Sequence, residues 1–257
     1  MSLAVELVGG LSSQGGGHGS ILECIINPGG KRGIAKIVNH REGFAYPELE
    51  RTPLAEYLPH YYGNHVIDGK EYIVIENLTS GFSSPSIMDL KVGTRHYDLS
   101  ASKEKIEGQI EKTKSTTSFT LGVRLIDGKT RKNGKTYQAW NRKDALNFSK
   151  EDLKECLLSF LPTEWLRNQF IQQVQAFRSS FSKTLEIFPG FRVYASSLLL
   201  IYDGDADLNN CELRVKFIDF AHMYLDIRSE DADINNPEYN DNVILGCESL
   251  ITLVQNK

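Results

Sequence analysis

The chain has 257 residues, 40% of them hydrophobic and 24% charged, with a formal net charge of -4 at pH 7. This is the composition of an ordinary soluble globular protein with room for one large domain or two lobes. No run of eighteen apolar residues and no basic start followed by an apolar stretch is present, which argues against a membrane span and a secretion signal. The four cysteines lie far apart without a CxxC pair, which argues against a zinc site or a disulfide framework. We therefore expect an intracellular protein, cytoplasmic or nuclear, with no membrane partner.

Charge is unevenly distributed along the chain. Residues 91–143 hold 13 Lys and Arg against 5 Asp and Glu, a local balance of +8, whereas the remainder holds 16 against 28, a balance of -12. Such a cationic segment either keeps the surface soluble or receives an anionic ligand. Nucleic acid is the disfavoured ligand, because the segment has no recognised nucleic-acid module and no clear pattern of stacking aromatics.

The first 80 residues predict a small antiparallel sheet with a helix. A glycine-rich loop at 9–19 precedes a predicted hairpin that closes around "NPGGKRG". In the following strand, "GIAKIV", Lys36 projects from a largely buried element, where a lysine needs an anion. Residues 46–63 look helical between their prolines, and "KEYIVIENL" is a strong strand candidate. The Gly/Ser/Pro stretch "TSGFSSP" is the best lobe boundary.

The stretch "PSIMDLKVG", residues 85–93, alternates between two kinds of side chain. As a strand it points Met88, Leu90 and Val92 to one face and Asp89 and Lys91 to the other. The first face is a core face, and the second carries a pair of opposite charges.

The remaining sequence predicts helices and hairpins. We expect a polar helix at 100–114, and a hairpin of "SFTLGVRLIDG" and "KTYQAWN" that reverses at Asn133-Gly134. Two amphipathic helices follow Ser149 and Thr163. The last third predicts a hairpin from "FRVYASSLLLIYDGD" and "CELRVKFIDFAHM", then a closing helix over 241–257.

Three groups suit phosphoryl transfer, which needs a cation on nucleotide phosphates, an oxygen ligand for magnesium and a group that positions the acceptor. Lys36 is a candidate for the first, and Asp219 in "KFIDFAH" for the second. Asp89 and Lys91 are candidates for the third. Each also has a structural interpretation: a surface lysine, a turn-forming aspartate and a simple ion pair. Their combination and order favour the functional one.

The order of these motifs resembles the inositol polyphosphate kinase family. The family signature Pro-x-x-x-Asp-x-Lys-x-Gly is matched by Pro85, Asp89, Lys91 and Gly93, and the resemblance runs from about residue 8 to about residue 254. "DLKVGTR", "SASKEK", "TTSFTLGVR" and "VYASSLLLIYDG" look most like the inositol hexakisphosphate kinase branch. The multikinase branch typically carries a histidine where Tyr202 stands.

The resemblance implies an α+β fold with two kinase-like lobes. The expected N-lobe, residues 1–80, holds an antiparallel sheet with a helix, the glycine-rich loop, the strand lysine and the hinge. The larger C-lobe, 81–257, holds an antiparallel sheet and helices, with an inositol-phosphate-binding helical segment at 96–118. The implied cofactors are ATP and Mg²⁺ and the implied substrate is an inositol polyphosphate. We expect a monomer.

Site residues follow from the same resemblance. Lys36 would contact the ATP phosphates, and the hinge residues Glu76 and Leu78 would offer backbone groups to adenine. Asp89 would lie near the ATP ribose and the catalytic centre. Lys91 would bridge the transferred phosphate and the acceptor oxygen, and so both bind substrate and take part in catalysis.

The implied metal and substrate ligands come mainly from the second half of the chain. Asp219 of the Ile-Asp-Phe motif would coordinate magnesium and contact ATP, with Ser196 or Ser197 beside it. Lys112 and His222 would meet substrate phosphates, which gives a use for the +8 segment.

The expected reaction is phosphorylation of inositol hexakisphosphate to a diphosphoinositol. The alternatives are a multikinase that phosphorylates ring hydroxyls of less phosphorylated inositols, and a non-catalytic module that binds inositol phosphates. Protein kinase activity is disfavoured, because "NHRE" at 39–42 resembles a protein-kinase catalytic loop but ends in Glu42 instead of aspartate and lies before the hinge.

Overall fold

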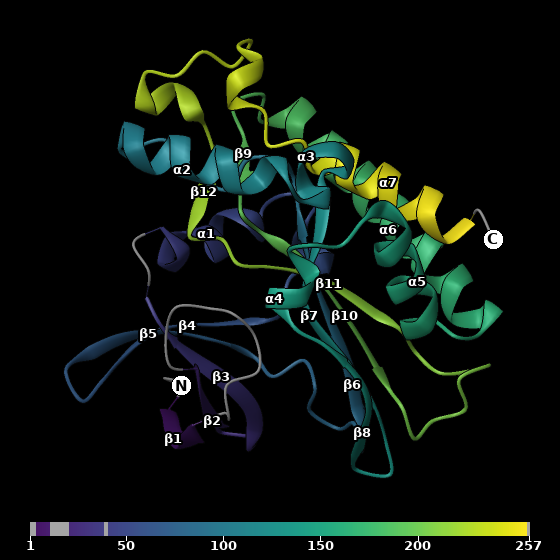
Figure 1. Ribbon diagram of the computed structural model, residues 1–257. Coiled ribbons are helices and arrows are strands. Elements are labelled where there is room, and N and C mark those ends of the chain that lie inside the picture. The colour runs from purple at the N-terminus through teal and green to yellow at the C-terminus, as the bar shows by residue number, and fades with distance from the viewer. Residues whose placement is uncertain (1–3, 11–20, 39–40, 256–257) are drawn as a thin grey trace.

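A computed structural model describes residues 4–10, 21–38 and 41–255. Two five-stranded antiparallel sheets lie side by side, and helices cover the second of them (Figure 1). The predicted α+β class with two antiparallel sheets is confirmed. Most of the predicted glycine-rich loop, residues 11–19, lies outside the described residues. Within the described part, no helix is long and apolar enough to cross a membrane.

The first sheet is built from the N-terminal third of the chain, with the order β1-β2-β3-β5-β4. Its strands are β1 (Ala4–Gly10), β2 (Ile21–Asn27), β3 (Lys31–Ile37), β4 (Tyr61–Ile67) and β5 (Lys70–Glu76). On β3, Ala35 is fully buried in a small apolar cluster with Cys24, Ile26 and Val74. Lys36 therefore points to the opposite face, towards helix α1 (Glu42–Leu49).

The helix predicted over residues 46–63 is wrong in its bounds. The helix α1 begins earlier, at Glu42, and ends at Leu49, and a short 3-10 turn, η1 (Ala55–Tyr57), follows. Residues 61–63 belong to β4, whose tyrosine-rich start pairs with β5. Pro47, the sixth of the eight residues of α1, has no N–H to donate to the Gly43 carbonyl, which accepts from Asn64 Nδ2 at 3.2 Å instead. Tertiary pairing of β4 outweighs the local helical pattern.

The second sheet has the order β11-β10-β6-β7-β8 and holds the signature strand at its centre. Its strands are β6 (Pro85–Val92), β7 (Val123–Lys132), β8 (Lys135–Trp140), β10 (Ser197–Asp203) and β11 (Arg214–Ile218). Met88, Leu90 and Val92 are buried in the main core, as the alternation predicts. The reversal at Asn133-Gly134 is also confirmed, because both residues have positive φ angles, 51° and 72°.

The described part of this half holds six α-helices and two short 3-10 turns, η2 (Ile227–Glu230) and η3 (Pro237–Tyr239). The α-helices are α2 (Lys103–Lys114), α3 (Thr117–Leu121), α4 (Arg142–Ala145), α5 (Lys150–Phe160), α6 (Glu164–Ile187) and α7 (Val243–Gln255). Ser149 forms a capping box with Asp152 at the start of α5, and the Thr163 hydroxyl caps α6, which satisfies backbone N–H groups that a helix start leaves free. Residues 118–121, predicted as strand, form α3 instead.

Direct hydrogen bonds join the second sheet to the N-terminal third. On β11, Lys216 donates its ammonium to the backbone carbonyls of Glu56 at 3.0 Å and Leu58 at 3.1 Å. Arg214, on the same strand, donates to the carbonyl of Leu78 at 3.0 Å. A small third sheet pairs β9 (Arg192–Tyr194) with β12 (His222–Tyr224). These connections place β3, β6 and the turn after β11 around one shared region.

Candidate active site

A triangle of charges joins the two large sheets. Lys36 Nζ lies 3.0 Å from Glu42 Oε1, at the start of α1, and 3.0 Å from Oδ1 of Asp219, just after β11. Burial lowers the pKa of Lys36, but the Asp219 and Glu42 carboxylates outweigh it and raise that pKa above its usual range. Lys36 thus stays an ammonium ion. The anion predicted for this buried lysine is supplied by Glu42 and Asp219.

Glu42 is a site residue that the sequence interpretation missed. Glu42 was considered only as the last residue of "NHRE", which resembles a protein-kinase catalytic loop. Its pairing with Lys36 was therefore not predicted. Its side chain is 1% exposed, and Oε2 has no hydrogen-bond partner. A glutamate in the first turn of a helix that follows the strand lysine was the available signal.

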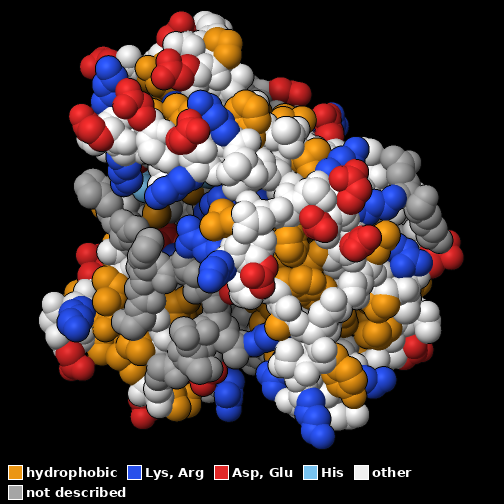
Figure 2. All heavy atoms as spheres, viewed as in Figure 1, with side chains coloured by type: hydrophobic (Ala, Val, Ile, Leu, Met, Phe, Trp, Pro, Cys, Tyr) orange, Lys and Arg blue, Asp and Glu red, His pale blue; other side chains and the backbone are white. Residues whose placement is uncertain are grey.

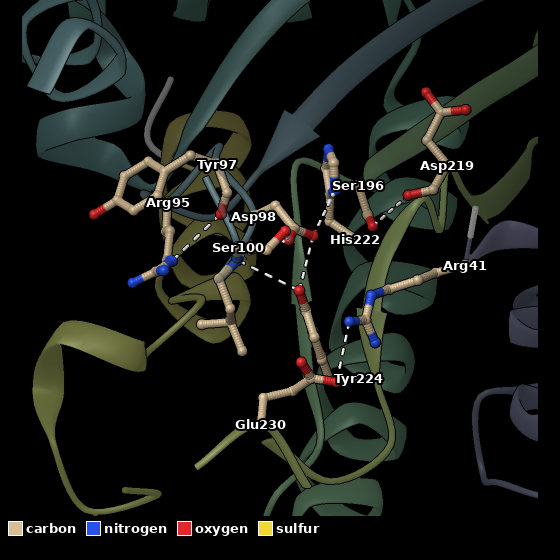
Figure 3. A network of polar contacts seen from close by, with 11 residues as sticks. Arg41, Arg95, Tyr97, Asp98, Ser100, Ser196, Asp219, His222, Tyr224 and Glu230 are labelled. Carbon is tan, nitrogen blue, oxygen red and sulfur yellow. Dashed lines mark hydrogen bonds and ion pairs between the residues drawn. The ribbon is translucent and has the colours of Figure 1, made fainter. Parts of the chain in front are cut away.

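Asp219 is held in an unusual backbone conformation. Its φ angle of 67° is in the left-handed region, which is rare for residues other than glycine. The Ser196 hydroxyl donates to the Asp219 carbonyl at 2.6 Å (Figure 3), which fixes this turn. The Asp219 side chain is 40% exposed, so its carboxylate reaches solvent.

Asp219 fits a magnesium ligand better than the two serines do. Mg²⁺ prefers oxygen ligands and is often held by one or two carboxylates together with phosphate oxygens. Ser196 and Ser197 are fully buried, and the Ser196 hydroxyl is already engaged with the Asp219 backbone. Within the described residues, no group of three or more His, Cys, Asp and Glu side chains could hold a metal. A metal at Asp219 would therefore need ligands beyond such a cluster, for example the oxygens of a bound phosphate.

Asp89 is buried beside the triangle. It lies on β6 opposite Asp127 of β7, it is 8% exposed, and its Oδ1 has no hydrogen-bond partner. Burial raises the pKa of Asp89 to about 7, and the Asp219 carboxylate adds to this increase. A carboxyl group with this pKa changes charge near neutral pH.

Lys91 lies two residues further along the same face. Its ammonium donates to the carbonyl of Ala195 at 2.7 Å, just before Ser196 and β10. Burial lowers the pKa of Lys91; the Asp219 and Asp89 carboxylates oppose this, and Arg124 and Arg142 reinforce it. Lys91 thus stands between an acidic side and a basic side of the site.

The basic side holds three cations that we call the cation cluster, Lys91, Arg124 and Arg142, with the His96 imidazole beside them. Arg124 is opposite Lys91 in the β6–β7 register and is 7% exposed, and its Nε has no hydrogen-bond partner. Burial and the Arg142 guanidinium lower the pKa of Arg124 to about 10. Burial, Arg124 and Lys91 lower the pKa of His96, and neither of its ring nitrogens has a partner. Asp89 partly offsets the charge of Lys91 and Arg124, but among the described residues no carboxylate forms an ion pair with a member of the cation cluster, and a bound anion would supply one.

Surface charge extends this basic character. Figure 2 shows Lys and Arg side chains on the face between α2 and α4, intermixed with acidic side chains over α2 itself. The charge of the 91–143 segment left both a solubilising surface and an anion site open, and it did not single out His96, Arg124 or Arg142. The signal for Arg124 was its place in the "GVR" strand that pairs with the signature strand.

The comparisons with known proteins agree with this site. Residues 72–255, well over half of the chain, match the inositol polyphosphate kinase family. The chain belongs to the inositol polyphosphate kinases. Inositol hexakisphosphate kinase 2 from Homo sapiens is 30% identical over 217 residues, which cover 72% of this chain and 51% of the human protein. The inositol polyphosphate multikinase from Homo sapiens is 29% identical over 206 residues, covering 74% and 45% respectively.

Solved structures give the same family fold. Inositol phosphate multikinase Ipk2 from S. cerevisiae, in complex with ADP and Mn²⁺, aligns with a TM-score of 0.70 and 25% identity over 87% of this chain and 98% of the other. The chain spans about half the length of the hexakisphosphate kinases it matches. The predicted family and two-lobed kinase fold are therefore confirmed, whereas the lobe boundary at residue 80 stays a prediction.

The two residues predicted to contact adenine, Glu76 and Leu78, have clear positions. Glu76 ends β5, and its backbone N–H donates to the His60 carbonyl at 2.8 Å. The Leu78 carbonyl accepts from Arg214, whose guanidinium lies 4.3 Å from the centre of the Phe82 ring. The hinge predicted at these residues is thus anchored to the second sheet.

Lys112 and His222 differ in how the structure holds them. Lys112 lies exposed on α2, and no contact joins it to Lys36, Lys91 or Asp219 in the described part of the chain. His222 begins β12, three residues after Asp219, and Nδ1 lies 3.0 Å from Asp98 Oδ2. The structure thus pairs His222 with Asp98, close in the chain to Asp219, and leaves Lys112 on the outer surface.

Proposed function

We propose that this chain is an ATP-dependent kinase that phosphorylates inositol hexakisphosphate to a diphosphoinositol. The cation cluster carries the proposal. Lys91, Arg124 and Arg142 come together without a carboxylate that satisfies them all, next to the lysine of the family signature. A substrate with a phosphate on every ring carbon would supply several of the missing anionic oxygens at once.

The nucleotide belongs on the acidic side of the site. Lys36, held by Glu42, would meet the ATP phosphates, and the backbone at Glu76 and Leu78 would face adenine. Magnesium at Asp219 would neutralise phosphate charge during transfer. The multikinase structure with bound ADP and Mn²⁺ supports a nucleotide and a divalent metal in this fold. Lys36 would exchange its bond to Asp219 for a bond to phosphate.

Lys91 would act where the phosphoryl group is transferred from ATP to the inositol phosphate. A phosphate oxygen of the substrate forms the new bond to the γ-phosphorus of ATP as the bond to the β-phosphate oxygen breaks, and ADP leaves. The attacking oxygen is already anionic, so no base has to remove a proton. The ammonium of Lys91 would reduce the repulsion between the two phosphates, since it lies between Asp219 and Arg124.

One observation favours a second candidate, the multikinase reaction on a ring hydroxyl. A hydroxyl must lose its proton, and a base is best matched to this when its pKa lies near the working pH. Asp89, with a pKa raised to about 7, meets that condition. The likeness to multikinases in sequence and structure is consistent with this alternative.

Incubation with labelled ATP, Mg²⁺ and a panel of inositol phosphates tests the proposal. Label in a diphosphate made from inositol hexakisphosphate supports it, and label confined to new monoesters supports the multikinase. Binding without any transfer would instead indicate a module that only senses inositol phosphates. Lys91→Ala is the matched control, because it keeps the β6 strand and removes the proposed bridge. We expect no turnover from this variant.

A further inference from the structure

Asp98 sits at the centre of a hydrogen-bond network that includes His222, and no role in nucleotide or substrate binding is assigned above to Asp98 itself. Its Oδ1 accepts from the backbone N–H of Ser100 at 2.9 Å and also from the Ser100 hydroxyl (Figure 3). Its Oδ2 accepts from the Tyr224 hydroxyl at 2.8 Å and lies 3.0 Å from His222 Nδ1. Asp98 is 9% exposed, so these groups replace most of its contact with water. The network joins the start of the 96–118 segment to β12.

The network fixes which ring nitrogen of His222 carries a proton. Burial raises the pKa of Asp98, but hydrogen bonds from Ser100, Tyr224 and His222 outweigh it and hold that pKa well below its usual range. An ionised carboxylate only accepts hydrogen bonds, so His222 Nδ1 must be the donor. The opposite nitrogen, Nε2, makes no hydrogen bond to any described residue, and 33% of the side chain is exposed. It is free to contact a ligand.

Tyr224 is itself held in place from two sides. Its hydroxyl accepts from the backbone N–H of Leu99 at 3.3 Å, which directs its own proton to Asp98. The Arg41 guanidinium lies 4.0 Å from the centre of its ring and forms an ion pair with Glu230 at 3.0 Å. Tyr224 therefore restrains the Asp98 carboxylate, and the carboxylate in turn restrains the orientation of the His222 ring.

We infer that Asp98 is a positioning residue for substrate binding: it orients the His222 ring, keeps the proton on Nδ1 and presents Nε2 to a substrate phosphate. This inference rests on the proposed function, in which His222 meets the inositol polyphosphate. A lone carboxylate near a polyanion site would repel the substrate. Here the carboxylate accepts from four donors, so its charge is directed at these groups and away from the substrate.

A double-mutant cycle tests the inference through kinetics. Asp98→Ala should raise the KM for inositol hexakisphosphate about tenfold or more and leave the KM for ATP near that of the wild type, since a hydrogen bond to a charged group is worth about that factor. In a His222→Ala background, the Asp98→Ala change should have almost no further effect on either constant. Effects that multiply across the two variants would overturn the inference. Asp207→Ala, an exposed carboxylate that only holds its own turn, is the matched control.

A spectroscopic readout makes the test independent of substrate. Two-bond ¹⁵N–¹H spectra at about pH 8.5 report which nitrogen of a neutral histidine bears the proton. The chain has 6 histidines, so His222→Gln identifies the signal by its disappearance. The wild type should show the Nδ1–H form and Asp98→Ala the Nε2–H form; an unchanged signal would refute the role of Asp98. Asp98→Asn, which keeps the size of the side chain, serves if the alanine variant does not fold, and it should show an intermediate KM.

The two hypotheses fail in different ways. If the wild type transfers phosphate to no inositol phosphate, the proposed function is wrong, whatever the tautomer of His222. If the wild type is active but His222 keeps its tautomer in Asp98→Ala, the positioning role is wrong and the proposed function stands.

Discussion

Replacing Asp89 with asparagine should make the protein more stable at neutral and alkaline pH. Asp89 is 8% exposed, one of its oxygens has no partner, and its neighbours include the carboxylates of Asp219 and Asp127. Ionising such a group inside the protein costs free energy, because neither water nor a close cation compensates it fully. Asparagine has almost the same shape and carries no charge. The wild type therefore carries a loss of stability at Asp89 that its place in the candidate active site explains.

The sign and size follow from the pKa. In the folded protein the pKa of Asp89 is about 7, against a model value of 3.8, so between these values the folded state binds more protons than the unfolded state. The contribution of Asp89 to stability is therefore favourable at low pH and is lost as pH rises through this window. At about 1.4 kcal/mol per pKa unit, the loss from about pH 4.5 to about pH 8 is roughly 3 kcal/mol. The Asp89→Asn variant should not show this loss of stability, because asparagine does not ionise.

Urea unfolding of both proteins at about pH 4.5 and about pH 8 measures this difference, with EDTA present so that no metal neutralises the carboxylates. The stability difference between variant and wild type should grow by roughly 3 kcal/mol from the lower to the higher pH. Comparing the stability difference at the two pH values cancels any cost of burying the asparagine amide, because that cost does not depend on pH. A difference that stays constant, or one that shrinks with rising pH, would refute the assignment of a high pKa to Asp89.

Three further predictions concern other parts of the molecule. Lys36→Met should remove the cation from Glu42 and Asp219 and reduce nucleotide affinity at least tenfold, measured by calorimetry with ADP; unchanged affinity would exclude Lys36 from the nucleotide site. Arg124→Ala should raise the KM for inositol hexakisphosphate by about ten- to a hundredfold and weaken its salt dependence, with the KM for ATP unchanged; equal effects on both substrates would contradict the cation cluster. Gly246→Ala should destabilise the fold by about 2 kcal/mol, because the added Cβ would clash with the carbonyl oxygen of Gly122. Gly108→Ala, on an open part of α2, is its control in thermal unfolding, and equal stability of the two variants would contradict the close α7 packing.

Short-range patterns in the sequence carried much of this structure. The alternation in β6 was enough to separate the core residues Met88, Leu90 and Val92 from Asp89 and Lys91, because side chains of a strand alternate between its faces. The caps at Ser149 and Thr163 located two helix starts for an equally local reason. Family resemblance, not periodicity, supplied the expected roles of the charged residues.

Contacts between distant segments could not be read in this way. Glu42 meets Lys36 only because α1 folds back over β3, and Asp219 joins them from 183 residues away. Arg124 and Arg142 join Lys91 through the β6–β7 register and the short α4 helix, and both of these depend on contacts between segments that are distant in the sequence. The error over residues 118–121 has a similar origin, since α3 packs on α2 and α7 and this overrides its strand-like composition.

The product formed from inositol hexakisphosphate tests the central claim most directly. Phosphorus NMR of a reaction with ATP and Mg²⁺ distinguishes a diphosphate, whose two phosphorus nuclei split each other's signals, from a monoester, which shows no such coupling. We predict coupled diphosphate signals with the wild type and none with Lys91→Ala. Monoester signals alone, formed from less phosphorylated inositols while inositol hexakisphosphate stays unchanged, would contradict the proposed reaction.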